Sequence, residues 1–175
     1  EGLSIPASVA STFSDRMLCM KTMRLHHFKA ASNLGRPLAL QRRAMPLVRI
    51  DIANSASPQV VRAVSDVVYD AMTSVASVPA NDRFQVITRH GSDELVYPSD
   101  GYLGVTYSPG IVFIQVTWNS GRSVEVKKAF YRAVAEGIAD KAGVRIQDVW
   151  ISLIDVARED WSFGNGDMQY APKPA

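Results

Sequence analysis

Residues 45–52 read Met-Pro-Leu-Val-Arg-Ile-Asp-Ile, and this stretch divides the chain into two parts of different character. Within it, Val48, Ile50 and Ile52 alternate with residues that fall on the opposite face. Strict alternation of this kind predicts a half-buried β-strand. The part of the chain that follows carries further patterned segments, whereas the part that precedes it shows no sustained periodicity.

Length and composition suit one domain with a hydrophobic core and one appended segment. The 175 residues are 47% hydrophobic and 21% charged, which is typical of a globular protein. Cys19 is the only cysteine in the sequence, so no intrachain disulfide and no cysteine metal cluster can form. No apolar run approaches the roughly 20 residues that span a bilayer. We therefore expect no membrane partner and a cytoplasmic protein.

The N-terminal segment, residues 1–45, carries the positive charge of the chain. It holds seven Lys and Arg residues against two acidic ones, whereas residues 46–175 hold twelve against fifteen. Because the domain is slightly acidic, the pI of 8.8 does not indicate a nucleic-acid partner. The composition of the segment suits either an organellar transit peptide or an upstream region outside the native reading frame. We expect residues 46–175 to form the domain, with the N-terminal segment outside its core.

Pro46 is a candidate catalytic group because of the methionine before it. If Met45 is the true start, removal of that methionine leaves Pro46 with a free secondary amine. An α-amino group has a reference pKa of about 7.7–8.0, which is near the range that a general acid or base needs. If the chain runs through from Glu1, Pro46 is a tertiary amide and carries no proton chemistry.

Periodicity predicts the remaining elements of the domain. Ser57 followed by proline is a typical helix start, and Gly143 is a typical residue after a helix end. Residues 91–109 are rich in turn-forming residues and predict a long irregular connection. The run from 111 to 118 is almost continuously apolar, which predicts a central strand covered on both faces. The patterns predict helices over residues 58–77 and 123–142, and strands over residues 84–90, 111–118 and 149–156.

The domain contains an internal repeat. A shift of 66 residues superimposes Asp82 on Asp148 and Ile50 on Val116, so both the helices and the strand alternation agree. Each half is strand–helix–strand, a unit that joins parallel strands through a right-handed crossover. The predicted fold class is α/β (α+β), a duplicated β-α-β with a four-stranded sheet and two helices on one face. Apolar residues on the uncovered face would require an oligomer.

Two further segments carry a family resemblance. Residues 78–85, Val-Pro-Ala-Asn-Asp-Arg-Phe-Gln, and residues 161–166, Trp-Ser-Phe-Gly-Asn-Gly, resemble the malonate semialdehyde decarboxylase branch of the tautomerase superfamily, whose enzymes use an amino-terminal proline. The resemblance begins at Pro46 and extends to about residue 170. It implies a tautomerase-like fold, a homotrimer and an enzyme without a metal or an organic cofactor.

The resemblance also implies roles for individual residues. Pro46 matches the catalytic proline, and Asp82 matches the aspartate that assists it and activates water in the decarboxylase. Arg122 matches the second of two arginines that hold the substrate carboxylate, whereas the first falls on Ser120. A planar guanidinium suits this task because it donates two parallel hydrogen bonds to a carboxylate.

Two aromatic residues near the end of the chain complete the candidate site. Trp161 and Phe163 match aromatic residues of the pocket wall, so with Ser120 they are candidate substrate-binding residues. An apolar wall and a nearby cation such as Arg122 would lower the pKa of the Pro46 amine and leave it neutral at pH 7. Packing in the core or in a subunit interface is an equally good explanation of the two aromatic residues.

Other candidates have structural explanations. Asp82 falls on the repeat position of Asp148, so both aspartates can be structural caps before a strand. Arg83, Arg89 and His90 lie close to the candidate site in the sequence, but we expect them at the surface.

The leading functional hypothesis is a cofactor-free keto–enol tautomerase acting on a small 2-oxo or enol carboxylic acid. Decarboxylation of malonate semialdehyde, or hydration of an unsaturated acid, is the alternative reaction. Ser120 argues against the decarboxylase, because the loss of one carboxylate contact typically costs about 2–5 kcal/mol. If the N-terminal segment stays attached and blocks Pro46, the protein is instead a trimeric scaffold or binding module.

Overall fold

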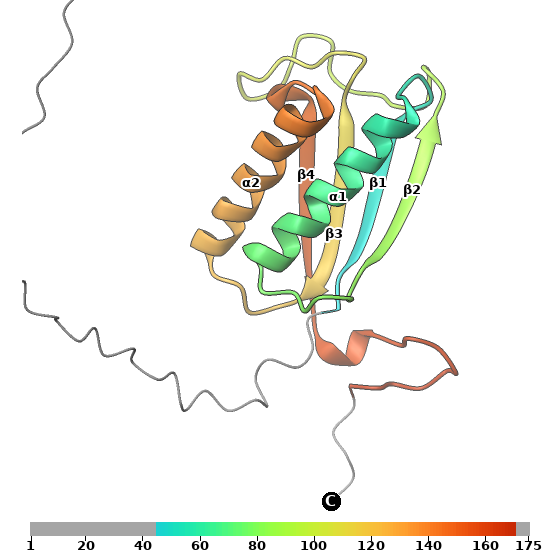
Figure 1. Ribbon diagram of the computed structural model, residues 1–175, viewed down its shortest axis with the longest axis vertical. Coiled ribbons are helices and arrows are strands. Elements are labelled where there is room, and N and C mark those ends of the chain that lie inside the picture. The colour runs from blue at the N-terminus through green and yellow to red at the C-terminus, as the bar shows by residue number, and fades with distance from the viewer. Residues whose placement is uncertain (1–44, 171–175) are drawn as a thin grey trace, which may run out of the picture. The chain divides into compact units, whose positions relative to one another are not determined.

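The computed structural model describes residues 45–170, which form one sheet with two helices packed against it (Figure 1). The N-terminal segment lies outside the described residues except for Met45. The elements in chain order are β1 (Leu47–Ala53), α1 (Pro58–Ser74), β2 (Phe84–His90), β3 (Val112–Asn119), α2 (Val124–Ala142), the 3-10 turn η1 (Ile146–Asp148), β4 (Val149–Val156) and the 3-10 turn η2 (Arg158–Asp160).

The sheet has the strand order β2-β1-β3-β4 and confirms the predicted duplication. Within each half the two strands are parallel, with Ile50 opposite Ile87 in the first and Ile114 opposite Ile151 in the second. The two halves meet through an antiparallel pairing of β1 with β3, which sets Ile50 opposite Ile114. The starts of β1 and β2 therefore lie at the same end of the sheet as the ends of β3 and β4.

The helix boundaries follow from local chemistry. The Ser57 hydroxyl accepts a hydrogen bond from the Val60 amide at 3.2 Å, and Ser123 caps α2 in the same way. These caps satisfy amide groups that have no partner within the helix. Gly143 ends α2 with a φ of 67°, a left-handed conformation that glycine adopts without steric cost.

Two predictions about these elements are wrong in detail. Helix α1 ends at Ser74 rather than at residue 77, because Ser77 has a φ of 57° and the Val78 amide turns back to the Met72 carbonyl. Strand β3 is central as predicted, but the helices cover only one of its faces. On its other face, Phe113 is partly exposed.

The core lies between the helices and one face of the sheet. Burial of each large apolar side chain contributes about 1.5–3 kcal/mol, so this layer supplies most of the stability of the fold. Trp118 of β3 contacts Phe130 of α2 with ring centroids 5.2 Å apart. The sheet residues beneath the helices are each at most 2% exposed and comprise Val48, Ile50, Ile52, Val112, Ile114, Val116 and Trp118.

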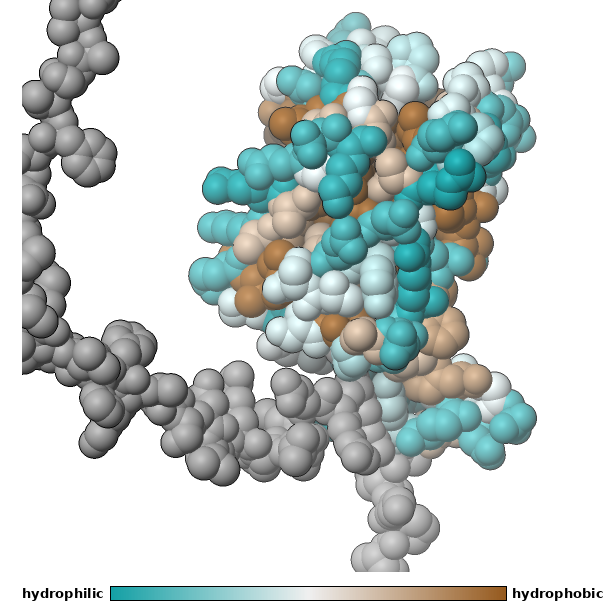
Figure 2. Space-filling model, viewed as in Figure 1, coloured by the Kyte–Doolittle hydropathy of each residue, from teal (hydrophilic) through white to brown (hydrophobic). Residues whose placement is uncertain are grey.

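The other face of the sheet, which we call the open face, has no helix over it (Figure 1). The side of the molecule that carries the helices is largely hydrophilic (Figure 2). Strand alternation directs four large apolar side chains of the edge strands to the open face, namely Phe84 (50% exposed), Val86 (41%), Trp150 (42%) and Ile154 (38%). Within residues 45–170, no helix is long and apolar enough to cross a membrane.

A single glycine allows the two helices to approach closely. A Cβ atom at Gly137 of α2 would lie 2.7 Å from Cγ1 of Val67, a buried residue of α1. Gly137→Ala should gain about 1 kcal/mol of helix propensity but lose about 1–3 kcal/mol to the steric overlap. We expect a net decrease of about 1 kcal/mol in the free energy of unfolding, measured by urea denaturation.

The matched control removes the overlap. In a Val67→Ala background, Gly137→Ala should raise the free energy of unfolding by up to about 1 kcal/mol. An increase in the otherwise unchanged protein would contradict the steric explanation.

Candidate active site

The sheet topology brings the predicted site residues to one end of the domain, at the bottom of Figure 1. Pro46 immediately precedes β1, and Asp82 lies just before β2. Ser120 and Arg122 lie in the connection after β3, and Trp161 follows η2. Residues separated by more than 100 positions in the sequence thus lie at one edge of the sheet.

Pro46 is buried at this edge. The register pairs Leu47 with Phe84 of β2 and with Thr117 of β3, so Pro46 lies where β2 begins and β3 ends. In the chain as it stands, Met45 acylates the proline nitrogen. A free amine in this buried position would be held with little conformational freedom at the start of a central strand.

Arg122 is held by two backbone carbonyls and one aromatic ring. Its Nε donates to the Ala76 carbonyl at 3.1 Å, and its Nη1 donates to the Asn119 carbonyl at 3.0 Å. The guanidinium carbon lies 4.2 Å from the ring centroid of Trp118, a distance that allows a cation–π interaction. Burial lowers the pKa of Arg122, and the nearby Asp155 carboxylate partly opposes this change.

Asp155 of β4 fixes the tryptophan beneath Arg122. The Trp118 indole Nε1 donates to one carboxylate oxygen of Asp155 at 2.6 Å, and Lys127 donates to the other at 2.5 Å. The Lys127 hydrogen bond, with help from Trp118 and Arg122, lowers the pKa of Asp155. Asp155 is therefore ionised at neutral pH and helps to balance the charge of Arg122.

The aromatic residues lie in the C-terminal aromatic segment, which we define as residues 158–170. The Trp161 indole Nε1 donates to the side-chain oxygen of Asn119 at 2.8 Å. Phe163 stacks on Trp161 with ring centroids 5.6 Å apart, and Tyr170 packs edge-on against Phe163 at 5.0 Å. Ser120 is exposed beside this segment, and its amide donates to a β4 carbonyl.

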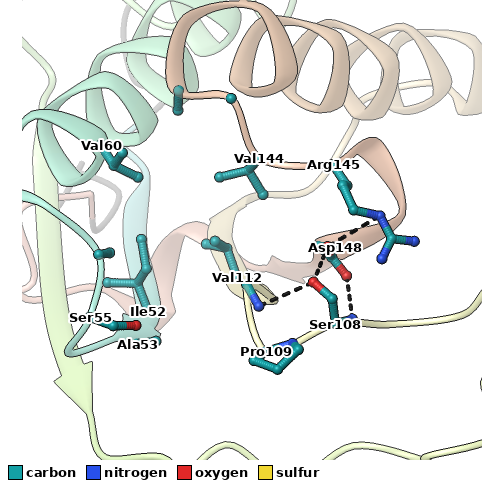
Figure 3. A pocket seen from close by; sticks show the side chains of 14 residues that line it. Ile52, Ala53, Ser55, Val60, Ser108, Pro109, Val112, Val144, Arg145 and Asp148 are labelled. Atoms are coloured by element: carbon teal, nitrogen blue, oxygen red, sulfur yellow. Dashed lines mark hydrogen bonds and ion pairs between the residues drawn. The ribbon is translucent and has the colours of Figure 1, made fainter.

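Asp82 differs from its repeat counterpart Asp148. Burial raises the pKa of the Asp82 carboxyl, and no hydrogen bond or ion pair to its carboxylate occurs within residues 45–170. Asp148 is 1% exposed and accepts hydrogen bonds from the Ser108 amide at 2.7 Å and the Ser108 hydroxyl at 2.6 Å (Figure 3). Asp148 is thus a structural cap, whereas Asp82 has a carboxylate that can act on a ligand.

The Asp148 end of the sheet also has a cavity, of about 390 Å³, opposite the candidate site (Figure 3). Under the 66-residue repeat, Val112 occupies the position of Pro46 and Ala56 the position of Arg122. Both residues line the cavity. Although Pro109 and Arg145 also line this cavity, neither occupies the repeat position of Pro46 or of Arg122.

The remaining polar candidates make structural contacts. Arg83 pairs with Asp66 at 2.6 Å, and Arg89 donates to carbonyl groups of the β1–α1 connection. His90 contacts Asp51 at 2.7 Å on the open face. Among residues 45–170, no group of three or more His, Cys, Asp or Glu side chains is arranged to hold a metal ion.

Two residues of this site were not predicted from the sequence. Asn119 accepts a hydrogen bond from the candidate residue Trp161. Asp155 accepts one from Trp118, the residue whose ring lies beneath Arg122. A weak signal exists, because each is a polar residue on the helix-facing or terminal part of an otherwise apolar strand. That pattern does not reveal which distant side chain such a residue contacts.

Comparison with known proteins decides the family. A model of a family described as tautomerase enzyme matches residues 82–164. The probable tautomerase YusQ of Bacillus subtilis (strain 168) is 37% identical over 125 residues, which cover 71% of this chain and 98% of that protein. The chain belongs to the tautomerase superfamily.

Solved structures place this member of the tautomerase superfamily in the predicted branch. It is similar to FG41 malonate semialdehyde decarboxylase inhibited by 3-bromopropiolate, with 40% identity, a TM-score of 0.65 and coverage of 71% of this chain and 93% of that one. Another malonate semialdehyde decarboxylase, described for its decarboxylase and hydratase activities, is 30% identical, with a TM-score of 0.64 and coverage of 70% and 94%. The predicted fold and branch are confirmed.

The difference between Asp148, which is a structural cap, and Asp82, whose carboxylate has no such partners, is testable. Asp148→Ala should lower the free energy of unfolding by about 2–4 kcal/mol, because it removes charge-assisted hydrogen bonds and leaves the Ser108 amide without its acceptor. Asp82→Ala should change it by less than about 0.5 kcal/mol, since its carboxylate has no such partners. Equal losses in urea denaturation would show that Asp82 is also a structural cap.

Proposed function

We propose that this tautomerase-superfamily protein is an enzyme that interconverts the keto and enol forms of small 2-oxo carboxylic acids. Pro46 carries the proton when its amine is free, and no cofactor takes part. The observation that carries the proposal is the position of Arg122. It is a half-buried guanidinium fixed at the sheet end where Pro46 immediately precedes the first strand.

Arg122 can hold a carboxylate without losing its structural contacts. A guanidinium has five N–H groups, and the bonds to the Ala76 and Asn119 carbonyls use two of them. The Nη1 and Nη2 end can therefore donate two parallel hydrogen bonds to a substrate carboxylate. Fixing the guanidinium beforehand reduces the entropy lost on binding and aligns the substrate.

Pro46 then acts as general base and general acid in turn. A neutral amine takes the proton from the enol hydroxyl, and the resulting ammonium group returns a proton to the adjacent carbon. The buried position of Pro46 and the cation of Arg122 both favour the neutral amine at pH 7. The reaction is proton transfer alone and leaves no net change in charge.

Asp82 supports the alternative of decarboxylation or hydration. Its carboxylate makes no hydrogen bond or ion pair within the described residues and lies at the same sheet end, so it can orient or activate water. The similar FG41 protein is a malonate semialdehyde decarboxylase. The exposed Ser120, where the resemblance places the first of two arginines, favours tautomerisation over this alternative.

The open face supports a homotrimer, the assembly that the family resemblance implies. Four large apolar side chains of the edge strands lie exposed on it, and burial between subunits would remove them from water. If Pro46 remains acylated in the mature protein, such a trimer would serve as a scaffold or binding module.

The proline mechanism is tested with a chain that begins at Pro46. Ketonisation of phenylenolpyruvate should be rapid in this chain and absent from the 175-residue chain, in which Pro46 is an amide. Pro46→Ala and Arg122→Ala should each lower kcat/KM by about 100-fold or more. Arg132→Ala, at an exposed position on α2, is the matched control and should be neutral. Unchanged rates in both site variants would refute the assignment.

The alternative reaction has its own pH signature. The raised pKa of Asp82 means that its carboxylate protonates above the ordinary value of 3.8 as the pH falls. Acetaldehyde release from malonate semialdehyde should therefore decline on the acid side through that pKa and disappear in Asp82→Asn. Retention of this activity in Asp82→Asn would remove Asp82 from the mechanism.

The assembly is tested by sedimentation velocity. The protein should sediment as a trimer, and Trp150→Glu should shift it toward monomer because the new charge would be buried in the interface. Trp150→Phe keeps an apolar ring and should remain trimeric. A monomeric wild-type protein would contradict the proposal.

A further inference from the structure

Asn119 connects the two substrate-facing parts of the candidate site. It is the last residue of β3, and it is 7% exposed. Its backbone carbonyl accepts the Arg122 Nη1 bond, and its side-chain oxygen accepts the Trp161 Nε1 bond. The carboxylate-binding group and the aromatic segment are thus both positioned from one residue.

The hydrogen bond between Asn119 and Trp161 fixes the position of the C-terminal aromatic segment. Side chains within the C-terminal aromatic segment organise it locally, since Gln169 bonds both the Phe163 amide and the Gly164 carbonyl. Phe163 stacks on Trp161, so the position of the indole sets the position of the second ring. The Asn119 bond ties this preorganised aromatic unit to the end of the sheet.

We infer that Asn119 is a specificity-determining positioning residue, which fixes the aromatic segment at a set distance from Arg122 and so selects acids by the group on C3. This inference rests on the proposed function. With the carboxylate held by Arg122, the far end of the substrate faces Trp161 and Phe163. A flat unsaturated or aryl group stacks on such rings, whereas a methyl group gains little from them.

The bond does not place Asn119 in the chemistry itself. In the proposed mechanism, proton transfer requires Pro46, and Arg122 binds the substrate carboxylate. Asn119 contacts Arg122 through its backbone carbonyl, which accepts the Arg122 Nη1 hydrogen bond. Substitution of the Asn119 side chain therefore leaves that contact available. Loss of the Trp161 bond should change KM for bulky substrates far more than kcat.

The experiment compares two acids of different size in the chain that begins at Pro46. Exchange of C3 hydrogens for deuterium, followed by NMR, measures proton transfer in both pyruvate and phenylpyruvate. Trp161→Phe removes the indole donor but keeps an aromatic ring, and Asn119→Ala removes the acceptor. Each should raise KM for phenylpyruvate about 10-fold or more, with kcat within about 3-fold. In Asn119→Ala, exchange of pyruvate should stay nearly unchanged.

Two further variants sharpen the result. Asn119→Asp keeps an acceptor oxygen and should retain the preference for phenylpyruvate. The double variant Asn119→Ala/Trp161→Phe should be no worse than either single change, because both remove the same bond. Additive losses, or equal effects on the two acids, would overturn the inference.

A second measurement reports the bond without any activity. The Trp161 indole Nε1–H resonance, assigned by its loss in Trp161→Phe, should exchange with solvent at least 10-fold faster in Asn119→Ala. If the wild type exchanges neither acid, the proposed function fails, while this resonance still tests the Asn119 bond. Faster indole exchange with an unchanged KM ratio would confirm the bond and overturn the specificity role.

Discussion

The antiparallel pairing of β1 with β3 is the constraint on which the rest of the structure depends. Each half of the duplicated chain is a parallel strand pair with one helix, and this pairing alone joins the halves into one sheet. Because the pairing is antiparallel, the start of β1 lies beside the end of β3. Pro46 and the loop that contains Arg122 are therefore neighbours by topology rather than by sequence.

Trp118 links the core to the candidate site. Its ring is fully buried against α2, yet one face supports the Arg122 guanidinium and its nitrogen bonds Asp155. A cation placed over a buried ring is partly removed from water, and this desolvation lowers the pKa of Arg122. The same packing that stabilises the fold thus holds the charged group in a fixed orientation.

The duplication produced two sheet ends with different properties. At one end, Asp148 is fully engaged with the Ser108 loop and serves stability. At the other, Asp82 occupies the equivalent position but keeps its carboxylate outside such contacts. A repeated sequence position thus has two roles, because the surrounding loops, and not the aspartate itself, determine which groups the carboxylate meets.

The sequence by itself determined the elements and the family. Apolar periodicity, the Ser57 cap and the 66-residue repeat depend on local spacing, so they predicted the two helices, the four strands and the sheet with one uncovered face. The resemblance to the tautomerase superfamily supplied the candidate site residues, which all fall at one end of the sheet. Tertiary structure decided the contacts between distant positions. These include the Arg122 bond to the Ala76 carbonyl, the Asn119 bond to Trp161 and the early end of α1. Such contacts depend on how loops meet at a sheet edge, and no sequence period encodes that geometry.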